Sequence, residues 1–194
     1  MARAAHELVR QAVQGGQLKL YLDTNFLLDL VRPRGRTASA ELFAEACSRG
    51  WTCLASYFGQ MEALDVEQEH RWFLTRLRAG EHTERLLRRR RQRDLTKQQL
   101  RRVSTAFHTA LLEQDVQDKV SWLALGAEET EQALTLAETT NISAPDCLHL
   151  ATALQAGCDI LVTSDEGLKN AARPYIAAVT PEELVAAIRA RGGR

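Results

Sequence analysis

The sequence has no hydrophobic run long enough to cross a membrane, because charged residues occur at short intervals along the chain. Residues 1–16 also lack the continuous apolar core of a signal peptide. We therefore expect a cytoplasmic protein without membrane association. The apolar residues of this N-terminal segment recur at helical spacing and stop at Gly15-Gly16, which predicts a short accessory helix packed on the domain or on a partner.

Cysteine pairs and glycine-rich nucleotide motifs are missing too. The four cysteines form no CxxC motif and lie near no pair of histidines, so we expect buried hydrophobic side chains rather than a zinc site. Neither GxGxxG nor GxxxxGK followed by Ser or Thr occurs, which removes support for nucleotide-cofactor folds. Without repeats or a low-complexity linker, the chain predicts a single domain over residues 1–194. The cysteines are Cys47, Cys53, Cys147 and Cys158.

The formal net charge is zero, but positive and negative charges are unevenly distributed along the chain. Residues 71–102 hold eleven arginines and one lysine against three acidic residues, so this segment carries +9 and the rest of the chain −9. No strand is expected between about 70 and 115, where Thr96 and Gln99 form a capping box ahead of an amphipathic helical pattern. We expect a basic helical hairpin inserted at 70–115, with Arg88–Arg93 at its tip.

Short apolar runs alternate with helical patterns along the rest of the chain. This alternation predicts right-handed βαβ units and an α/β fold of three layers, with a central parallel sheet of about five strands flanked by helices. Such sheets bind ligands beyond the carboxyl ends of their strands, where the strand order reverses. The expected strands are residues 18–22, 51–55, 120–125, 159–163 and 175–179. The expected helices are residues 25–31, 37–49, 57–69, 128–139, 146–156, 166–171 and 181–191.

Four carboxylates lie at or just after the expected strand ends. Asp23 follows the first strand and Asp165 follows the fourth. Asp146 opens the helix of ISAPDCLHLATAL, and Glu62 lies in the helix after the second strand. Because parallel strands present their carboxyl ends to one edge of the sheet, we expect the four side chains to lie near one another.

Helix capping is the competing explanation for each aspartate taken singly. Ser143 and Asp146 fit a capping box, and so do Thr180 and Glu183, where nothing indicates chemistry. Capping does not explain Glu62, which lies well inside its helix between apolar neighbours. A carboxylate on the buried side of a helix is costly unless it is paired or bound to a cation.

Four separated motifs have the order and context of one family: LDTNFLLDL at 22–30, SYFGQME at 56–62, APDCLHLATAL at 144–154 and LVTSDEGL at 161–168. In these motifs the chain resembles the PIN domain nucleases, and within them the VapC-like toxins of toxin–antitoxin pairs. The resemblance implies a PIN-like fold, an antitoxin partner and a homodimer. The N-terminal helix and the longer basic hairpin depart from the family pattern. The acidic set that the resemblance implies is Asp23, Glu62, Asp146 and Asp165.

Carboxylates gathered in one pocket repel one another unless a cation neutralises them. Oxygen-only ligands in an incomplete cage favour Mg²⁺ or Mn²⁺, which retains water and accepts phosphate oxygens. We therefore expect metal-dependent hydrolysis of RNA phosphodiester bonds. Asp23 and Asp146 are expected to ligate the metal directly, and Asp165 directly or through water. Glu62 is expected to orient a water or to complete a second site. The residues expected to hydrogen-bond around this set are Asn25, Thr163 and Ser164.

The arginine-rich hairpin supplies the cations that an acidic pocket lacks, and arginine pairs well with phosphate. The alternatives for the same residues are a solvated helix face or an interface with an acidic partner. The residues expected to bind nucleic acid are Arg85, Arg88, Arg89, Arg90, Arg91 and Arg93.

Other functions fit the sequence less well. A haloacid-type phosphatase needs a second carboxylate two residues after the first, where Asn25 stands, and a receiver domain leaves Glu62 unexplained. The remaining alternative is a non-catalytic PIN-like module that binds nucleic acid or a partner through the basic hairpin. His149 is expected to be a hydrogen-bonded, partly buried side chain rather than a metal ligand or proton carrier.

Overall fold

A computed structural model describes residues 16–32 and 37–192, so the expected N-terminal helix lies outside the described residues. Five parallel strands form one sheet in the order β3-β2-β1-β4-β5. This sheet confirms the predicted α/β fold, and each strand begins and ends within two residues of the expected range. The strands are β1 Lys19–Leu22, β2 Thr52–Ser56, β3 Val120–Leu123, β4 Ile160–Val162 and β5 Ala177–Val179.

The strand order reverses at β1. The chain passes from β1 through β2 to β3 on one side, and then returns to β4 and β5 on the other side of β1. In the register of the central pair, Leu22 lies opposite Val162. The residues that follow these two, Asp23 and Thr163, therefore leave the sheet at the same level and at its switch point.

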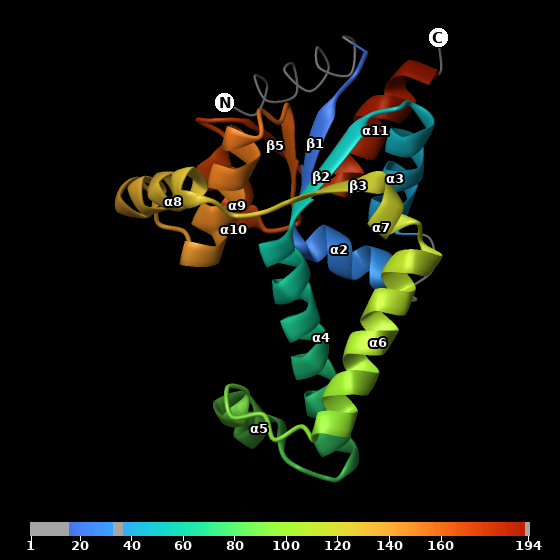
Figure 1. Ribbon diagram of the computed structural model, residues 1–194, viewed down its shortest axis with the longest axis vertical. Helices are drawn as coiled ribbons and strands as arrows, with labels where there is room; N and C mark the ends of the chain where they lie inside the picture. The colour runs from blue at the N-terminus through green and yellow to red at the C-terminus, as the bar shows by residue number, and fades with distance from the viewer. Residues whose placement is uncertain (1–15, 33–36, 193–194) are drawn as a thin grey trace.

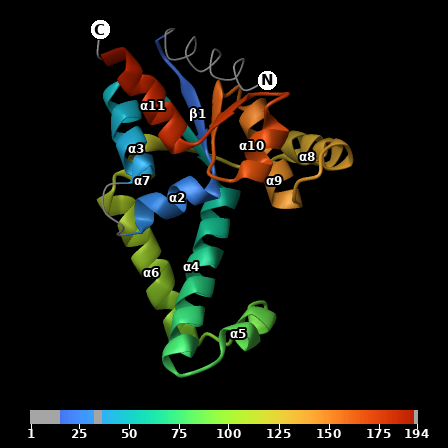
Figure 2. The same ribbon diagram turned by 180° about the vertical axis from the view of Figure 1, so that it is seen from behind.

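Helices cover both faces of the sheet, as Figures 1 and 2 show. Alternate strand residues enter opposite layers: Leu20 and Leu22 join one buried cluster, whereas Tyr21 and Leu161 join the other. The first cluster includes side chains of α2 (Thr24–Val31), α3 (Ala38–Ser48) and α11 (Pro181–Gly192). The second includes side chains of α8 (Ala127–Thr139), α9 (Ala144–Gln155) and α10 (Glu166–Ala172).

The basic hairpin projects away from the sheet as two helical arms, α4 (Tyr57–Arg78) and α6 (Lys97–Glu113). α4 begins at the Ser56 cap directly after β2 and has no glycine or proline after its first turn, so it runs unbroken past residue 70. It ends before Gly80, whose positive φ of 85° suits a turn. The predicted capping box of Thr96 and Gln99 begins α6. α6 leads through the short helix α7 (Val116–Lys119) into β3.

A short helix, α5 (Thr83–Arg89), lies at the far end of the hairpin beside α4 (Figure 1). The segment between α5 and α6 contacts α4 through polar side chains. Asp94 accepts hydrogen bonds from the Trp72 indole, at 2.8 Å, and from Arg76. Arg93 pairs with Asp65 at 2.5 Å. The arginine-rich run thus lies at the end of the hairpin. The first arm is the continuation of α4 from Tyr57, so the expectation of a helix that ends at residue 69 was wrong. Among the described residues, no helix is both long enough and apolar enough to cross a membrane.

Candidate active site

The ends of β1 and β4 are joined by the Thr163 hydroxyl. Thr163 Oγ1 donates to Asp23 Oδ2 at 2.5 Å and accepts a hydrogen bond from the Asp165 backbone N–H at 3.0 Å. The Asp23 N–H donates to the Val162 carbonyl at 3.2 Å, which extends the β1–β4 pairing to the site. Two of the predicted acidic residues are therefore brought together by one of the predicted hydroxyls.

Both of these aspartates also cap helices. Asp23 Oδ1 accepts from the Phe26 N–H at the start of α2, and Asp165 Oδ1 accepts from the Leu168 N–H at the start of α10, each at 2.9 Å. Capping uses one oxygen of each carboxylate. The second oxygen of Asp23 receives the Thr163 hydroxyl, whereas Asp165 is exposed and its second oxygen has no hydrogen bond among the described residues. Capping alone therefore leaves these outer oxygens unexplained.

Asp23 is almost fully buried, with 3% of its surface exposed. Burial raises the pKa of this carboxyl to about 6, against the lowering effect of its hydrogen bonds from Thr163 and Phe26. The nearby charge of Asp165 raises the pKa of Asp23 further. A buried carboxylate in this position favours a nearby positive charge, because a cation would offset both the burial and the repulsion.

Glu62 is held by a second group of side chains. Its Oε2 accepts a hydrogen bond from the Thr24 hydroxyl and lies 3.0 Å from His149 Nε2. The hydrogen bond with His149 lowers the pKa of Glu62, so this carboxyl stays ionised. Thr24 is the residue after Asp23 and the first residue of α2. The two groups therefore meet at the junction of β1 and α2.

His149 is more buried than the sequence indicated, with 3% exposure, and its hydrogen bonding confirms the expectation. Its Nδ1 lies 2.9 Å from the Tyr21 hydroxyl, which in turn donates to Ser56 Oγ at 3.1 Å. Gly59 makes room for the imidazole: a Cβ there would lie 3.0 Å from His149 Cε1. The side chains that orient Glu62 are thus fixed by β1, β2, α4 and α9.

Asp146 is not brought into contact with the other three acidic residues. Its Oδ2 accepts from the Ser143 hydroxyl at 2.6 Å and from the Ser143 N–H at 3.3 Å, in the capping box of α9. Within residues 16–32 and 37–192, no three Asp, Glu, His or Cys side chains lie close enough to hold a metal ion. Two acidic groups, Asp23–Asp165 and Glu62–His149, are formed without Asp146.

Two of the predicted polar partners make no side-chain hydrogen bond among the described residues. Asn25 and Ser164 are both exposed. The hydroxyl that binds Glu62 comes instead from Thr24, one residue before Asn25. Thr24 and Tyr21 are not among the site residues predicted from the sequence. The signal available for Thr24 was a hydroxyl directly after the first aspartate, whereas Tyr21 looked like any other residue of a buried strand.

The profile of the PIN domain matches residues 20–174 of the sequence. The chain belongs to the PIN domain family. The VapBC2 structure from Rickettsia felis, bound to a DNA fragment from its promoter, superposes with a TM-score of 0.54 and 12% identity, over 84% of this chain and 98% of that chain. The FitAcB structure from Neisseria gonorrhoeae gives a TM-score of 0.51 and 16% identity, over 84% and 98%. At these identities the likeness establishes the fold. No curated protein matches the sequence.

The donor set of this PIN domain suits a hard cation. The outer oxygens at the ends of β1 and β4 belong to carboxylates, and no sulfur lies among them. A cation would offset the burial of the Asp23 carboxylate and its repulsion by the nearby charge of Asp165. Asp23 and Asp165 therefore fit a divalent ion of the Mg²⁺ class, while Asp146 is turned toward Ser143.

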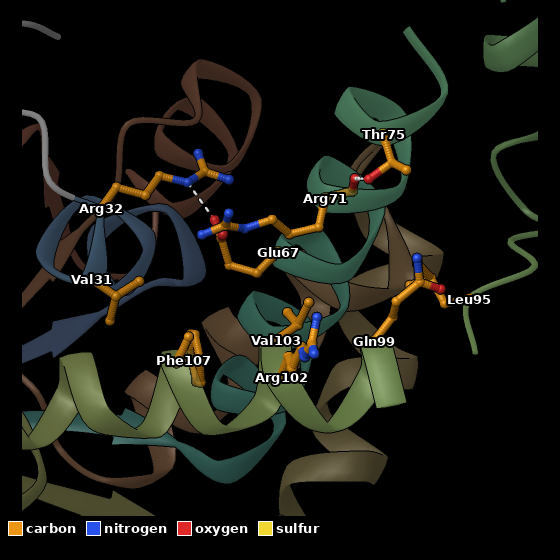
Figure 3. A pocket seen from close by; sticks show the side chains of 11 residues that line it. Val31, Arg32, Glu67, Arg71, Thr75, Leu95, Gln99, Arg102, Val103 and Phe107 are labelled. Atoms are coloured by element: carbon orange, nitrogen blue, oxygen red, sulfur yellow. Dashed lines mark hydrogen bonds and ion pairs between the residues drawn. The ribbon is translucent and has the colours of Figure 1, made fainter. Parts of the chain in front are cut away.

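A separate cleft of about 480 Å³ lies between α2, α4 and α6 (Figure 3). Its walls combine apolar side chains such as Val103 and Phe107 with arginines. Glu67 is the acidic residue in its lining, and Arg32 pairs with it at 2.5 Å. The cleft therefore offers no uncompensated carboxylate, and it lies apart from the acidic groups at the sheet edge.

The six arginines predicted to bind nucleic acid divide into two classes. Arg93 is paired with Asp65, and Arg89 lies 3.4 Å from Glu81. The others are exposed, and no ion pair involves them within the described part of the chain. These free arginines are Arg85, Arg88, Arg90 and Arg91.

Proposed function

We propose that this PIN domain is a metal-dependent endoribonuclease that hydrolyses RNA phosphodiester bonds. The observation that carries the proposal is the buried Asp23 carboxylate, linked through Thr163 to Asp165 at the switch point of a parallel sheet. An aspartate that only capped α2 would gain nothing from losing its water. The family to which the chain belongs, which generally consists of nucleases, supports the same reaction class.

Asp23, Asp146 and Asp165 are the proposed ligands of Mg²⁺ or Mn²⁺, with Glu62 beside them. A bound divalent ion would neutralise phosphate charge, lower the pKa of a bound water and stabilise the transition state. Asp23 and Asp165 would use the oxygens that helix capping leaves for other partners. Asp146 would have to exchange its hydrogen bonds with Ser143 for this role.

Glu62 is the proposed base that orients the attacking water and accepts its proton. An ionised carboxylate suits this task, and the hydrogen bond with His149 lowers the pKa of Glu62. Thr24 and His149 both bind Oε2, so Oε1 remains for a water molecule. His149 and Tyr21 are proposed as positioning residues, because His149 contacts Glu62 and Tyr21 contacts His149.

The hairpin arginines are proposed to bind the RNA backbone. Phosphate needs cations outside an acidic pocket, and the free arginines are exposed at the end of the hairpin. Arg89 and Arg93 are committed to Glu81 and Asp65, so they would contribute less than the others. The proposed set is Arg85, Arg88, Arg89, Arg90, Arg91 and Arg93.

The proposed biological role is the toxin of a cytoplasmic toxin–antitoxin pair, with an antitoxin partner and a homodimeric assembly. The fold likeness to the VapBC2 and FitAcB structures supports this role. Co-expression with the adjacent open reading frame tests it: rescue of growth and a co-purified complex are expected. Growth inhibition that no neighbouring gene relieves would contradict the antitoxin part of the proposal.

The catalytic proposal is tested by incubating purified protein with total RNA in Mn²⁺, Mg²⁺ or EDTA. Cleavage is expected in either metal and is expected to stop in EDTA. An Asp23→Asn/Asp146→Asn variant should lose the activity, because each change removes a charged ligand. An Asp118→Asn variant is the matched control, since Asp118 is an exposed acid on α7, which leads into the start of β3 at the opposite edge of the sheet. Equal cleavage by the double variant would contradict the assignment.

A non-catalytic binding module is the second candidate. It is favoured by the position of Asp146, which lies on Ser143 rather than with the other acidic residues. Heat denaturation with millimolar Mg²⁺ or Mn²⁺ separates the two, because a ligand that binds only the folded state raises the melting temperature. An unchanged melting temperature, together with RNA binding in EDTA, would favour the module.

A further inference from the structure

Lys169 of α10 is a buried cation to which the proposed mechanism gives no role. Only 3% of its surface is exposed. Its ammonium group lies 2.7 Å from Glu166 Oε1 and donates to Glu183 Oε1 at 3.3 Å. A buried charge is costly even when it is paired, so its place in the fold calls for an explanation.

The ion pair of Lys169 with Glu183 connects two helices that lie on opposite faces of the sheet. α10 packs into the buried cluster that includes Tyr21, whereas α11 packs into the cluster that includes Leu20 (Figure 2). The second oxygen of Glu183, Oε2, accepts a hydrogen bond from the Thr180 N–H at 2.8 Å, directly after β5. Lys169 therefore ties the start of α10 to the carboxyl end of β5.

This tie closes a ring of contacts around Asp165. The Asp165 carbonyl accepts a hydrogen bond from the Lys169 N–H at 2.9 Å, and the Asp165 N–H donates to Thr163 Oγ1 at 3.0 Å. The Thr163 N–H donates in turn to the Val179 carbonyl at 3.0 Å, and Thr180 follows Val179. Asp165 is thus held on both sides of its α-carbon, and the Lys169 ammonium group fixes where α10 starts relative to β5.

Gly167 leaves the room that the Asp165 carboxylate occupies. A Cβ at residue 167 would lie 3.0 Å from Asp165 Oδ1, which is closer than an ordinary van der Waals contact. The same oxygen accepts the capping hydrogen bond from the Leu168 N–H at 2.9 Å. A carboxylate is planar and rigid, so a shift of Oδ1 also moves the outer oxygen, Oδ2. The orientation of Asp165 therefore depends on the absence of a side chain at residue 167.

We propose that Gly167 and Lys169 are positioning residues that set the outer oxygen of Asp165 for a divalent ion. The inference rests on the proposed metal site and adds two residues that would not contact the ion. Gly167 acts through the space left for Oδ1, and Lys169 acts through the placement of α10. Substitution of a residue that orients a metal ligand typically weakens metal binding by about 10- to 100-fold.

Gly167→Ala separates positioning from stability, because alanine favours a helix more than glycine does. Heat denaturation in EDTA is expected to give a melting temperature equal to or above that of the wild type. Calorimetric titration is expected to show Mn²⁺ binding weakened about tenfold. Gly126→Ala is the matched control: its Cβ would lie 2.8 Å from Oε2 of Glu129, which caps α8 and is not a proposed ligand. Unchanged Mn²⁺ affinity in Gly167→Ala, or an equal loss in Gly126→Ala, would overturn the role of Gly167.

Lys169→Met tests the second residue, because methionine keeps an unbranched apolar side chain but removes the charge. The variant is expected to have a lower melting temperature and to bind Mn²⁺ about tenfold more weakly. Arg189→Met removes a different ion pair of α11, that with Glu41 of α3, and should leave Mn²⁺ affinity as in the wild type. A Lys169→Met variant that loses stability but binds Mn²⁺ like the wild type would make Lys169 a structural residue only.

The carboxyl carbon resonance of Asp165, measured by NMR without metal, separates this inference from the proposed metal site. The resonance is expected to shift in Gly167→Ala and in Lys169→Met, and to stay in place in Gly126→Ala. If it shifts in this way but the wild type binds no Mn²⁺, the metal site is contradicted while the orientation of Asp165 by α10 stands. If the wild type binds Mn²⁺ and neither variant weakens that binding, the positioning roles alone are contradicted.

Discussion

Thr163 and Asp23 lie 140 residues apart in the sequence, and their side chains form a 2.5 Å hydrogen bond at the ends of adjacent strands. The pairing of Leu22 with Val162 places them at one level. Thr163 also accepts from the Asp165 N–H, so one hydroxyl orients both aspartates. This contact is the structural basis for treating the sheet edge as one site.

Replacing Thr163 by valine is expected to lower the free energy of unfolding by about 2 kcal/mol at pH 7. The change keeps the side-chain shape but removes the donor that a buried carboxylate needs. Urea denaturation measures the difference. Thr163→Ser keeps the hydroxyl and should remain within about 1 kcal/mol of the wild type. A valine variant as stable as the serine variant would contradict the role given to this hydrogen bond.

The buried carboxyl of Asp23 makes stability depend on pH when no divalent ion is present. Its pKa is raised from 3.8 to about 6, so protonation favours the folded state. The stabilisation is complete below pH 4 and is lost as the pH rises through about 6. Asp23→Asn is neutral throughout, so it should be more stable than the wild type by about 3 kcal/mol at pH 8 and nearly equal to it at pH 4.

Chemical denaturation in EDTA across this pH range measures the difference between the Asp23→Asn variant and the wild type. Asp118→Asn is the matched control, because Asp118 is exposed on α7 and lies outside the site. A constant difference between Asp23→Asn and the wild type from pH 4 to pH 8 would show that Asp23 titrates normally.

Substitution of His149 by alanine should reduce both stability and cleavage. The change leaves Tyr21 and Glu62 without their shared partner inside the domain, and the expected loss of stability is about 3 kcal/mol. Cleavage should fall about tenfold or more through kcat, because Glu62 loses one of the two groups that orient it. His82→Ala, at an exposed histidine of the hairpin, should match the wild type.

The pH dependence of kcat in the His149→Ala variant distinguishes a positioning role of His149 from a purely structural one. Without His149, the hydrogen bond that lowers the pKa of Glu62 is lost. The acidic limb of the kcat profile should therefore move to higher pH. A variant with reduced activity but an unchanged profile would contradict the link between His149 and Glu62.

Capping and catalysis can be separated at Asp146. Ser143→Ala removes the hydroxyl that caps α9 and should cost about 1 kcal/mol of stability, while cleavage remains. Asp146→Asn keeps an oxygen that can accept the same hydrogen bonds, so it should retain most of the stability but lose cleavage. Urea denaturation and RNA cleavage of both variants give the comparison. The reverse pattern would make Asp146 a cap without a catalytic role.

Much of the fold could be predicted from the sequence because apolar runs alternate with helical patterns and the strands begin close to the expected residues. The length of α4 was not apparent, since its charged second half resembles a separate helix. Asp23, Thr163 and Asp165 could be placed together because all three follow strands. The sequence does not fix that β1 lies beside β4, which creates the Thr163–Asp23 contact.

Contacts that depend on side-chain packing could not be predicted in the same way. Tyr21, Ser56 and His149 come from three elements, and only the packing of α9 and α4 on β1 brings them together. At Asp146 the sequence motif predicted a metal ligand, but in the structure the nearby Ser143 hydroxyl donates to its carboxylate oxygen. A local capping partner and a distant metal leave the same pattern in the sequence.

Calorimetric titration of Mn²⁺ into the wild type and into Asp23→Asn/Asp165→Asn tests the central claim most directly, because the claim is that the ends of β1 and β4 form a divalent-ion site. The wild type is expected to bind Mn²⁺ with a saturable heat, and the double variant, folded by heat denaturation, is expected to lose that binding. Equal binding by both proteins, or none by the wild type, would contradict the account.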